Sequence, residues 1–481
     1  MSQFTCKELI KKGRHIPVPF EIFLRDAGAD TTLHIQAILR IVPRKRLVAL
    51  ATWKGTTCIA KLFFGRAHWQ QNRQRDLTGV TQLRDAGILT PEVVGVFDTP
   101  EGDGGVILFE YLEKARSLLD LFTAATVDAE RRDIVDKAID SIAQCHDAGL
   151  QQDDIHLDNF MLEGDRLYVL DGYDIKQHPT ALSPAARRAN LGLFFAQLAV
   201  AMDVNIPHWL SHYGCYSTGM EGESLATLTT AVRSARQRRL FIIENKLFRS
   251  ATATRLVQSR TRLAVYDRTR HSPALERLIA DPDQALAGGT MLKDGGASTV
   301  ALIDHEGRQY VLKRYNIKGF LHGLKRLFQP SRAHKSWRSA ATLLALGVAT
   351  PQPCLFVEER LCWLLRRRAW FLCEYVPAPS VLQLLEEGRL DGDLQCKILA
   401  QFNQLFQVMR EYNISHGDMK ASNFIYHDER LYVIDLDATK RHRSAAAARS
   451  SLQKDIERFR RNWIGTPLEQ PVQAMLEQHD A

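Results

Sequence analysis

The sequence predicts an α+β fold with two tandem bilobal domains, each joining a β-rich small lobe to a helical large lobe. Three observations lead to this prediction. The chain has 481 residues, more than one ordinary hydrophobic core holds. An ordered set of motifs occurs twice along it. In each copy, short β-rich runs precede long helical patterns. We therefore expect domains at 1–265 and 281–481, with a basic linker at 266–280.

The repeat is clearest where HGDMKASNFIYHDERLYVIDLD at 416–437 has a counterpart in QQDDIHLDNFMLEGDRLYVLDGYD at 152–175. The matched residues keep one constant spacing between the copies, and they are Asp154 with Asp418, Asn159 with Asn423, and Asp171 with Asp435. A single shared landmark could arise by chance, whereas an ordered series at constant spacing indicates a tandem duplication.

The elements follow the same order in both copies. The β-rich runs RLVALAT and TCIAKLFF open copy one, and STVALID and QYVLKRY open copy two. A polar helical stretch then ends at Gly87 or Gly347. A strand follows, GVILFEYL or WFLCEYV, and then long helical patterns, a loop and the strand LYVLD or LYVID. This order predicts a small lobe followed by a large lobe in each copy.

Composition and charge restrict the class of protein. The chain is 45% hydrophobic and 25% charged, and no run of about 18 apolar residues predicts a spanning helix. The eight scattered cysteines form no CxxC pair, which favours reduced thiols in the cytoplasm. The net charge is +8, with basic segments at 231–277 and 316–338. This excess favours an anionic partner. No recognition-helix, RNP or zinc-finger pattern is present, so nucleic acid is not expected.

The second copy carries the residue types that phosphoryl transfer needs. In HGDMKASN, an Asp stands two residues before a Lys and five before an Asn, and a strand-end Asp follows. We assign Asp418 as the catalytic base and Lys420 as a phosphate contact. Asn423 and Asp435 would bind Mg²⁺ across the phosphates of ATP, and the strand residue Lys313 would contact the α- and β-phosphates.

Other segments complete this nucleotide site. Gly295 and Gly296 in LKDGGASTV form a turn suited to covering phosphates, although hairpins often contain such a pair. Glu374 and Val376 flank Tyr375 in a hinge-like segment after the strand WFLCEYV. Asp455, on a later helical pattern, is a candidate carboxylate that supports the catalytic loop from below.

These motifs resemble those of the lipopolysaccharide core kinases, the heptose/Kdo kinase branch of the protein-kinase-like superfamily. HGDMKASN-x(11)-DLD resembles the HxDxxxxN and Asp-x-Asp/Gly motifs of that branch, and LKDGGASTV, VLKRYN, PSRAHKSWR and GVATP resemble its small-lobe segments. The similarity covers most of 275–465 and, more loosely, 35–250. It implies two protein-kinase-like domains and an ATP- and Mg²⁺-dependent kinase for sugar hydroxyls (heptose or Kdo) of the lipopolysaccharide inner-core glycan. It also implies a cytoplasmic enzyme in peripheral contact with the inner membrane of a Gram-negative cell.

The second copy departs from protein kinases at one position. Protein kinases pair the strand lysine with a glutamate on the following helix. The corresponding positions are Asp76 in copy one, a shorter substitute, and Ser336 in copy two, which offers no carboxylate. The partner of Lys313 is therefore left open, as is the register.

The first copy retains much of the same chemistry. Asp154 matches the catalytic base, Asn159 and Asp171 match the Mg²⁺ ligands, and Lys61 matches the strand lysine. His156 replaces Lys420, as in small-molecule kinases with DxHxxN motifs. A glycine turn is missing from this copy, and Asn190 replaces Asp455. Copy one is therefore expected to bind nucleotide, and it is either catalytic or a degenerate partner domain.

Two alternatives to a lipopolysaccharide core kinase remain at this stage. One is a soluble phosphotransferase of the aminoglycoside or choline kinase type, and the other is a pseudokinase scaffold, above all for copy one. The segment 316–338 is a further open case, because Phe320, Leu324 and Phe328 follow helical spacing between lysines and arginines. Such a helix would lie on an anionic membrane or pack on its own lobe.

Overall fold

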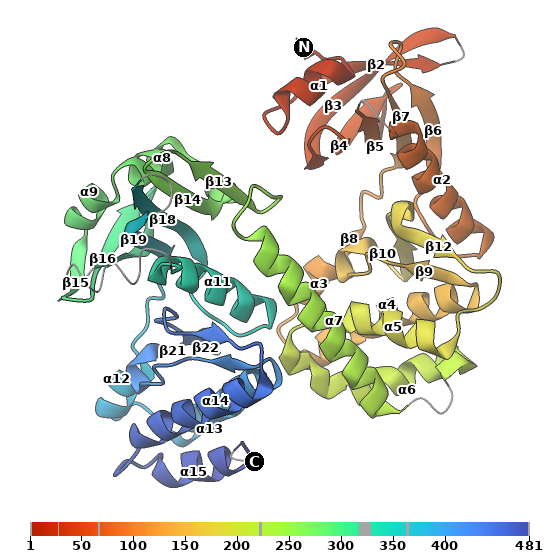
Figure 1. Cartoon of the computed structure of the whole chain (residues 1–481). Coiled ribbons are helices and arrows are strands. Elements are labelled where there is room, and N and C mark those ends of the chain that lie inside the picture. Colours follow the sequence, from red (N-terminus) through yellow and green to blue (C-terminus); the bar gives the residue numbers. More distant parts are fainter. Residues whose placement is uncertain are drawn as a thin grey trace. The chain divides into compact units, whose positions relative to one another are not determined.

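The computed structural model describes residues 2–26, 28–65, 68–220, 224–316, 329–361 and 365–479. The chain divides into two compact units, the first formed by Met1–Gln197 with Val204–Ala235 and the second by Leu198–Asp203 with Arg236–Ala481. Each unit contains a seven-stranded sheet and a helical part (Figure 1). This mixture of helices and strands agrees with the predicted α+β class, and the tandem bilobal arrangement stays a prediction.

The sheet of the first unit is antiparallel except for its first, parallel pair. In spatial order its strands are β1 (Ser2–Gln3), β2 (Phe20–Asp26), β3 (Ala29–Val42), β4 (Arg46–Trp53), β5 (Thr56–Phe64), β7 (Gly104–Glu110) and β6 (Val93–Asp98). Helix α1 (Cys6–Lys12) begins with a capping box between Thr5 and Glu8. Helix α2 (Trp69–Asp85) connects β5 to β6.

The remainder of the first unit is mainly helical, with three short strand pairings. Its elements are β8 (Arg116–Ser117), α3 (Leu118–Ala124), α4 (Asp128–Asp147), β9 (Leu150–Gln152), β10 (Phe160–Glu163), β11 (Arg166–Val169), β12 (Ile175–Gln177), α5 (Pro184–Phe195) and α6 (Ile206–Tyr216). Single 3₁₀ turns at Leu157–Asn159 and Gly172–Asp174 flank the β10–β11 hairpin. Helix α7 (Leu225–Lys246) starts in this unit, and its residues from Arg236 onward belong to the second.

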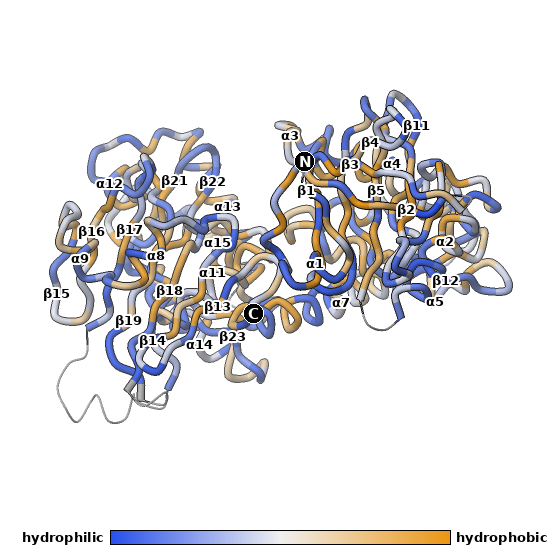
Figure 2. Tube along the Cα trace, turned by 90° about the horizontal axis from the view of Figure 1, so that it is seen from above, coloured by the Kyte–Doolittle hydropathy of each residue, from blue (hydrophilic) through white to orange (hydrophobic). Residues whose placement is uncertain are grey.

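The second unit repeats the antiparallel sheet with a different edge. In spatial order its strands are β13 (Thr254–Gln258), β14 (Arg262–Asp267), β18 (Pro353–Leu361), β19 (Leu365–Glu374), β17 (Arg308–Tyr315), β16 (Ser298–His305) and β15 (Thr290–Gly295). Helices α8 (Pro273–Ala280), α9 (Pro282–Ala287) and α11 (Arg332–Ala345) accompany this sheet. In Figure 2 the strands of both units carry much of the hydrophobic colour, whereas many connecting loops are hydrophilic.

The helical part of the second unit forms around an aromatic core. Its elements are α12 (Val381–Glu386), α13 (Gly392–Glu411), β20 (Ile414–Ser415), β21 (Phe424–His427), β22 (Arg430–Val433), β23 (Lys440–Arg441), α14 (Ala445–Arg461) and α15 (Glu469–Glu477). Phe402 of α13 makes edge-to-face contacts with Phe424 and Phe459, at centroid distances of 4.9 and 4.7 Å. These contacts fix the loop that precedes β21 against α13 and α14.

The fully buried Arg236 attaches the end of α7 to this helical part. Its guanidinium pairs with the Asp203 carboxylate at 2.7 and 2.8 Å and donates to the Tyr412 hydroxyl at 2.7 Å. A buried cation is tolerated only where such partners replace its water shell. Arg236 is therefore a structural residue of the second unit.

The residues before 281 differ from both the predicted end of the first domain at 265 and the predicted linker at 266–280. Residues 254–267 form β13 and β14 of the second sheet, and 273–280 form α8. Leu275, Leu278 and Ile279 of α8 are buried in the core beside this sheet. The many arginines hide this pattern in the sequence, because the apolar residues that enter the core are interspersed among them.

Two further findings concern membrane contact. The apolar and basic positions between 317 and 328, namely Lys318, Phe320, Leu321, Leu324, Lys325, Arg326, Leu327 and Phe328, lie outside the described residues. Among the helices that the structure describes, none combines the length and apolar character that crossing a membrane requires.

Candidate active site

The loop between β20 and β21 brings Asp418 and Asn423 together. The Asn423 side-chain nitrogen donates to the Asp418 carbonyl at 2.8 Å. The Ile434 N–H donates to the Asn423 carbonyl at 2.9 Å, which joins this loop to the segment that carries Asp435. Because the Asn423 amide nitrogen is engaged, its side-chain oxygen is the atom left to ligate a cation.

Asp455 of α14 supports this loop from below, as the sequence predicts. One carboxylate oxygen accepts the N–H of His416 at 2.6 Å, and the other accepts the N–H of Gly417 at 2.8 Å. Asp455 is only 3% exposed, and burial raises the pKa of its carboxyl even though these N–H groups favour the charged form. The two bonds fix the backbone immediately before Asp418.

Two cations lie beside the Asp418 carboxylate. Arg458 of α14 contacts one oxygen at 2.6 Å, and Lys420 lies 3.6 Å from the other. The Lys420 side chain is 55% exposed, so it is free to reach a phosphate group. Sequence reasoning missed Arg458, and the only signal available was its position one helical turn after Asp455.

The partner of Lys313 is the pair Asp435 and Asp437. The Lys313 ammonium lies 2.5 Å from an Asp435 oxygen and 3.8 Å from an Asp437 oxygen. Burial would raise the pKa of Asp435, but the nearby Lys313 ammonium holds it below its ordinary value. The predicted helix position, Ser336, instead shares a hydrogen bond of 2.9 Å with the Tyr315 hydroxyl.

Arg332, the first residue of α11, connects this pair to the glycine turn. Its guanidinium forms an ion pair with Asp437 and donates to the Ala297 carbonyl at 3.2 Å. The β15–β16 hairpin reverses at Gly296-Ala297, with Gly295 opposite Ser298 in the ladder. The turn that contains Gly295 and Gly296 is therefore tied, through Arg332, to the carboxylates around Lys313. The sequence contained both Arg332 and Asp437 but did not indicate that they pair.

The hinge-like segment continues from β19. The Glu374 N–H donates to the Gln352 carbonyl at 3.0 Å, and its carboxylate forms an ion pair with Arg270. Val376 is buried. Lys313 of β17 lies opposite Phe371 of β19. Strand β19 therefore connects the position beside Lys313 directly to the hinge-like segment.

The first unit has a corresponding set of contacts. The Lys61 ammonium lies 2.9 Å from Asp171 and forms a second ion pair with Asp76 of α2. The Asn159 side chain donates to the Asp154 carbonyl at 2.6 Å, as its counterpart does in the second unit.

Lys61 lies between two largely buried carboxyl groups, and their pKa values are shifted in opposite directions. Burial and the charge of Asp171 raise the pKa of Asp76, although the neighbouring Lys61 acts in the opposite direction. Burial would also raise the pKa of Asp171, but the Lys61 ammonium holds it below its ordinary value. Asp171 is therefore the carboxylate that stays charged and suits a cation.

Two glycines allow α2 to approach Asp171. A Cβ on Gly79 of α2 would lie 1.9 Å from the carbonyl oxygen of Gly172, and a Cβ on Gly172 would lie 2.4 Å from that of Asp76. Only glycine permits this close backbone contact. The contact brings Asp76 within reach of Lys61, so the first unit has the helix carboxylate that the second lacks at Ser336.

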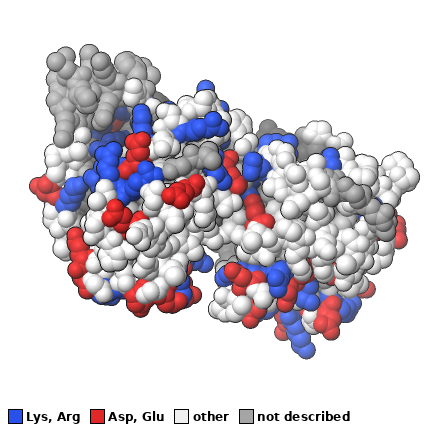
Figure 3. All heavy atoms as spheres, turned by 90° about the horizontal axis from the view of Figure 1, so that it is seen from below, with Lys and Arg blue, Asp and Glu red and all other residues white. Residues whose placement is uncertain are grey.

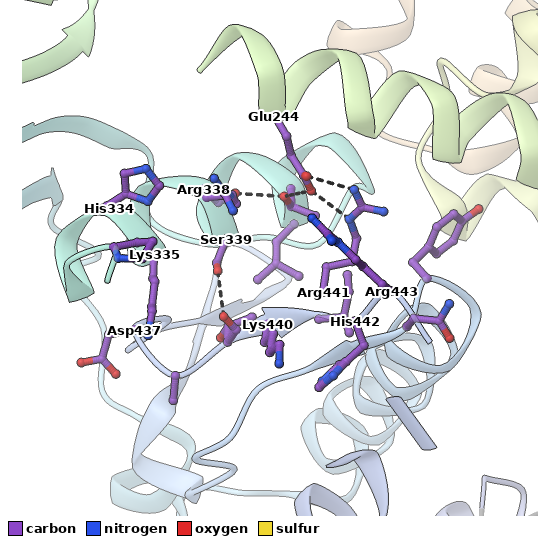
Figure 4. Close-up of a pocket in the computed structure, with 18 of the residues that line it drawn as sticks. Glu244, His334, Lys335, Arg338, Ser339, Asp437, Lys440, Arg441, His442 and Arg443 are labelled. Atoms are coloured by element: carbon purple, nitrogen blue, oxygen red, sulfur yellow. Dashed lines mark hydrogen bonds and ion pairs between the residues drawn. The ribbon is translucent and has the colours of Figure 1, made fainter. Parts of the chain in front are cut away.

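A cavity of about 700 Å³ adjoins Asp437 in the second unit (Figure 4). It lies between the end of α7, α11 and residues 437–443. Its basic lining residues are Lys335, Arg338, Lys440, Arg441 and Arg443. Glu244 holds the Arg441 guanidinium in two contacts of 2.8 and 2.9 Å. The cationic side chains that line the cavity make it suited to an anionic group. Lys and Arg side chains also gather on one face of this unit (Figure 3).

A strand lysine facing strand-end carboxylates, beside a loop with Asp and Asn, is the arrangement of a kinase-type phosphotransferase site. Residues 289–478 match the model of the lipopolysaccharide kinase (Kdo/WaaP) family. This match confirms the predicted resemblance to that family, for the second unit.

The other comparisons are more distant. No curated protein matches the chain. A solved structure described as "WaaP in complex with acyl carrier protein" is similar to this chain, with 17% sequence identity and a TM-score of 0.35. The similarity covers 44% of this chain and 86% of that one. The resemblance to the family therefore depends on the match of residues 289–478.

Proposed function

We propose that the second unit is an ATP- and Mg²⁺-dependent kinase that phosphorylates a sugar hydroxyl, of heptose or Kdo, in the lipopolysaccharide inner core. The observation that carries this proposal is the convergence of Lys313 and Asp435, beside the Asp418–Asn423 loop, inside the segment that matches the family. The matching family is described as lipopolysaccharide kinases. We propose the same activity for this chain.

Each of these residues has a distinct part in the proposed reaction. Asp418 accepts the proton of the attacking hydroxyl, and Arg458 keeps its carboxylate oriented. Lys420 contacts the transferred phosphoryl group, and Lys313 binds the α- and β-phosphates. The donor set of Asn423 and Asp435, an amide oxygen and a carboxylate that stays charged, fits Mg²⁺. When bound, the ion would neutralise phosphate charge.

The nucleotide would lie between the glycine turn and the hinge-like segment. Gly295 and Gly296 cover the phosphates, because a backbone without side chains can approach them closely. Glu374 and Val376 border the base of the nucleotide. Arg332 positions both the turn and Asp437, so it replaces the helix glutamate of protein kinases as the link between α11 and the lysine.

We further propose that the two units are tandem protein-kinase-like bilobal domains, which divide near residue 235 rather than at the predicted limits of 1–265 and 281–481. Matched backbone geometry supports this. Asp171 and Asp435 both have a positive φ, of 63° and 59°. Phe160 pairs with Val169 in one hairpin, and Phe424 pairs with Val433 in the other.

The first unit would also bind ATP and Mg²⁺, through Lys61, Asn159 and Asp171. Its Asp154 is positioned by Asn159 as Asp418 is by Asn423. The turn that corresponds to the glycine turn lies between β3 and β4 and is Pro43-Arg44-Lys45, which contains no glycine. The first unit is then one of two things: a catalytic domain with its own acceptor, or a degenerate domain that serves as a scaffold.

The basic cavity supports an anionic acceptor. A phosphorylated core glycan would be attracted to Lys335, Arg338 and Arg443, whereas a cationic aminoglycoside or choline would be repelled. Such an acceptor is anchored in lipid, so we propose a cytoplasmic enzyme in peripheral contact with the inner membrane. A soluble phosphotransferase of the aminoglycoside or choline type is the second candidate.

Phosphate transfer to defined acceptors tests this proposal. The full chain would be incubated with Mg²⁺ and ³²P-labelled ATP, and with dephosphorylated core lipopolysaccharide, kanamycin or choline. The proposal predicts incorporation into lipopolysaccharide only. Incorporation into a soluble acceptor would favour the second candidate. No incorporation, with nucleotide still bound, would refute a glycan kinase and favour a scaffold.

A further inference from the structure

Outside the nucleotide site, two helices of the first unit bring histidines and aspartates together. His208 and His212 lie one turn apart on α6, and Asp136 and Asp140 lie one turn apart on α4. The Nε2 atom of His208 is 2.9 Å from an Asp136 oxygen, and that of His212 is 2.7 Å from an Asp140 oxygen. Both imidazoles therefore direct the same nitrogen toward α4.

These side chains are close enough for one ion. The candidate ligand atoms of Asp136, His208 and His212 all lie within 4.8 Å of one another. The two imidazole rings are nearly parallel, with centroids 5.9 Å apart. A tetrahedral zinc ion with bonds of about 2 Å holds neighbouring ligand atoms about 3.3 Å apart. Small side-chain rotations would bring the present set to that spacing.

The helices that carry these ligands are firmly held. On the neighbouring face of α6, Trp209 stacks on Phe195 at 5.1 Å, and the hydroxyl of the buried Tyr213 accepts a hydrogen bond from Arg187 at 2.8 Å. The ligand stripe itself is accessible, since the side chains of His208 and His212 are 43% and 22% exposed. A site built on packed helices loses little conformational freedom when an ion binds.

We propose that Asp136, His208 and His212, with Asp140 as the fourth ligand, form a binding site for a divalent transition-metal ion such as Zn²⁺. Two imidazoles and two carboxylates suit zinc, nickel or copper, whereas Mg²⁺ prefers an all-oxygen set. The site is independent of the proposed kinase reaction, because none of these residues contacts Lys61, Asp154 or Asp171 among the interactions the structure describes. A bound ion would join α4 to α6 and stabilise the folded first unit.

Zinc titration of the chelator-treated full chain, without nucleotide, tests this site. Calorimetry should give one tight equivalent of Zn²⁺ for the wild type. His208→Ala and His212→Ala should each weaken that equivalent by roughly 100-fold. His34→Ala is the matched control, because His34 is also 43% exposed and pairs with a carboxylate, Glu21, at 3.2 Å. Its titration should match the wild type.

A second readout separates this site from zinc bound at other histidines and cysteines. Zn²⁺ should raise the melting temperature of the wild type and of His34→Ala, and should leave that of His208→Ala/His212→Ala unchanged. If the double variant unfolds, Asp136→Asn replaces it, because asparagine keeps the shape of the side chain. Zn²⁺ should likewise leave the melting temperature of Asp136→Asn unchanged. Equal binding in all variants, or no binding by the wild type, would overturn the proposal and leave two ordinary histidine–aspartate pairs.

Discussion

The support of the catalytic loop by Asp455 leads to a quantitative prediction. In Asp455→Asn, one oxygen remains, and the new amide group faces a backbone N–H that also donates. The variant therefore loses one charge-assisted hydrogen bond and leaves one buried N–H unsatisfied. Each effect costs about 1–3 kcal/mol, so we expect about 3 kcal/mol less stability for this loop. Asn190 serves at the matched position of the first unit because there it donates, to the Gln152 carbonyl at 2.8 Å, and accepts from His146.

Hydrogen–deuterium exchange of the segment 414–424 is the suitable assay. A loss of about 3 kcal/mol corresponds to exchange that is roughly 100-fold faster at His416 and Gly417. Asp393→Asn on α13 is the control, because that carboxylate is 81% exposed and its contact with Lys397 contributes little. If exchange in Asp455→Asn matched that in Asp393→Asn, Asp455 would not support the loop.

Three further changes test other parts of the structure. Gly79→Ala should destabilise the first unit by about 1–3 kcal/mol, because its Cβ would clash with the Gly172 carbonyl; urea unfolding measures this. Arg236→Met should cost about 3–5 kcal/mol, since it removes the buried guanidinium that pairs with Asp203 and donates to Tyr412; calorimetry measures this. Burial lowers the pKa of His146 from 6.5 to about 4, so the unfolded chain binds the extra proton between these values. Stability should therefore fall by up to about 3 kcal/mol as the pH drops from 6.5 to 4, and His146→Gln should flatten this slope in urea unfolding.

Each change has an outcome that would contradict its reasoning. Gly214→Ala on α6 is the control for Gly79→Ala, because its Cβ meets nothing within 4 Å and should stabilise the helix by about 0.5–1 kcal/mol. Equal effects of the two would remove the argument from close contact. An Arg236→Met protein as stable as the wild type would mean that the ion pair contributes nothing net. An unchanged pH slope in His146→Gln would assign acid sensitivity to other groups.

Local sequence determined much of the site. Constant spacing between the copies predicted the loops around Asn159 and Asn423, and both make the same hydrogen bond to the preceding aspartate. The support of the catalytic loop by Asp455 was also predictable, because a carboxylate buried on a helix beside a tight loop is usually an acceptor for the backbone N–H groups of that loop. These features depend on neighbours within one motif, which a sequence displays directly.

The partner of Lys313 depended instead on distant segments. Asp437 lies two residues beyond Asp435, and Arg332 lies at the start of α11, but only the folded chain shows that they pair. Likewise, the predicted limit of the first domain at 265 falls inside β14 of the second sheet, where Leu263, Ala264, Val265 and Tyr266 form a continuous buried run. Charged neighbours on both sides concealed a strand that the core requires.

The central claim is that the second unit transfers phosphate to the lipopolysaccharide core. The most direct measurement compares ³²P incorporation into dephosphorylated core lipopolysaccharide by the wild type, Asp154→Asn and Asp418→Asn. The account predicts that Asp418→Asn loses incorporation at its acceptor position by at least about 1000-fold, in line with loss of a positioned general base, while binding ATP normally. Full incorporation by Asp418→Asn, with loss only in Asp154→Asn, would contradict the account and make the first unit the kinase.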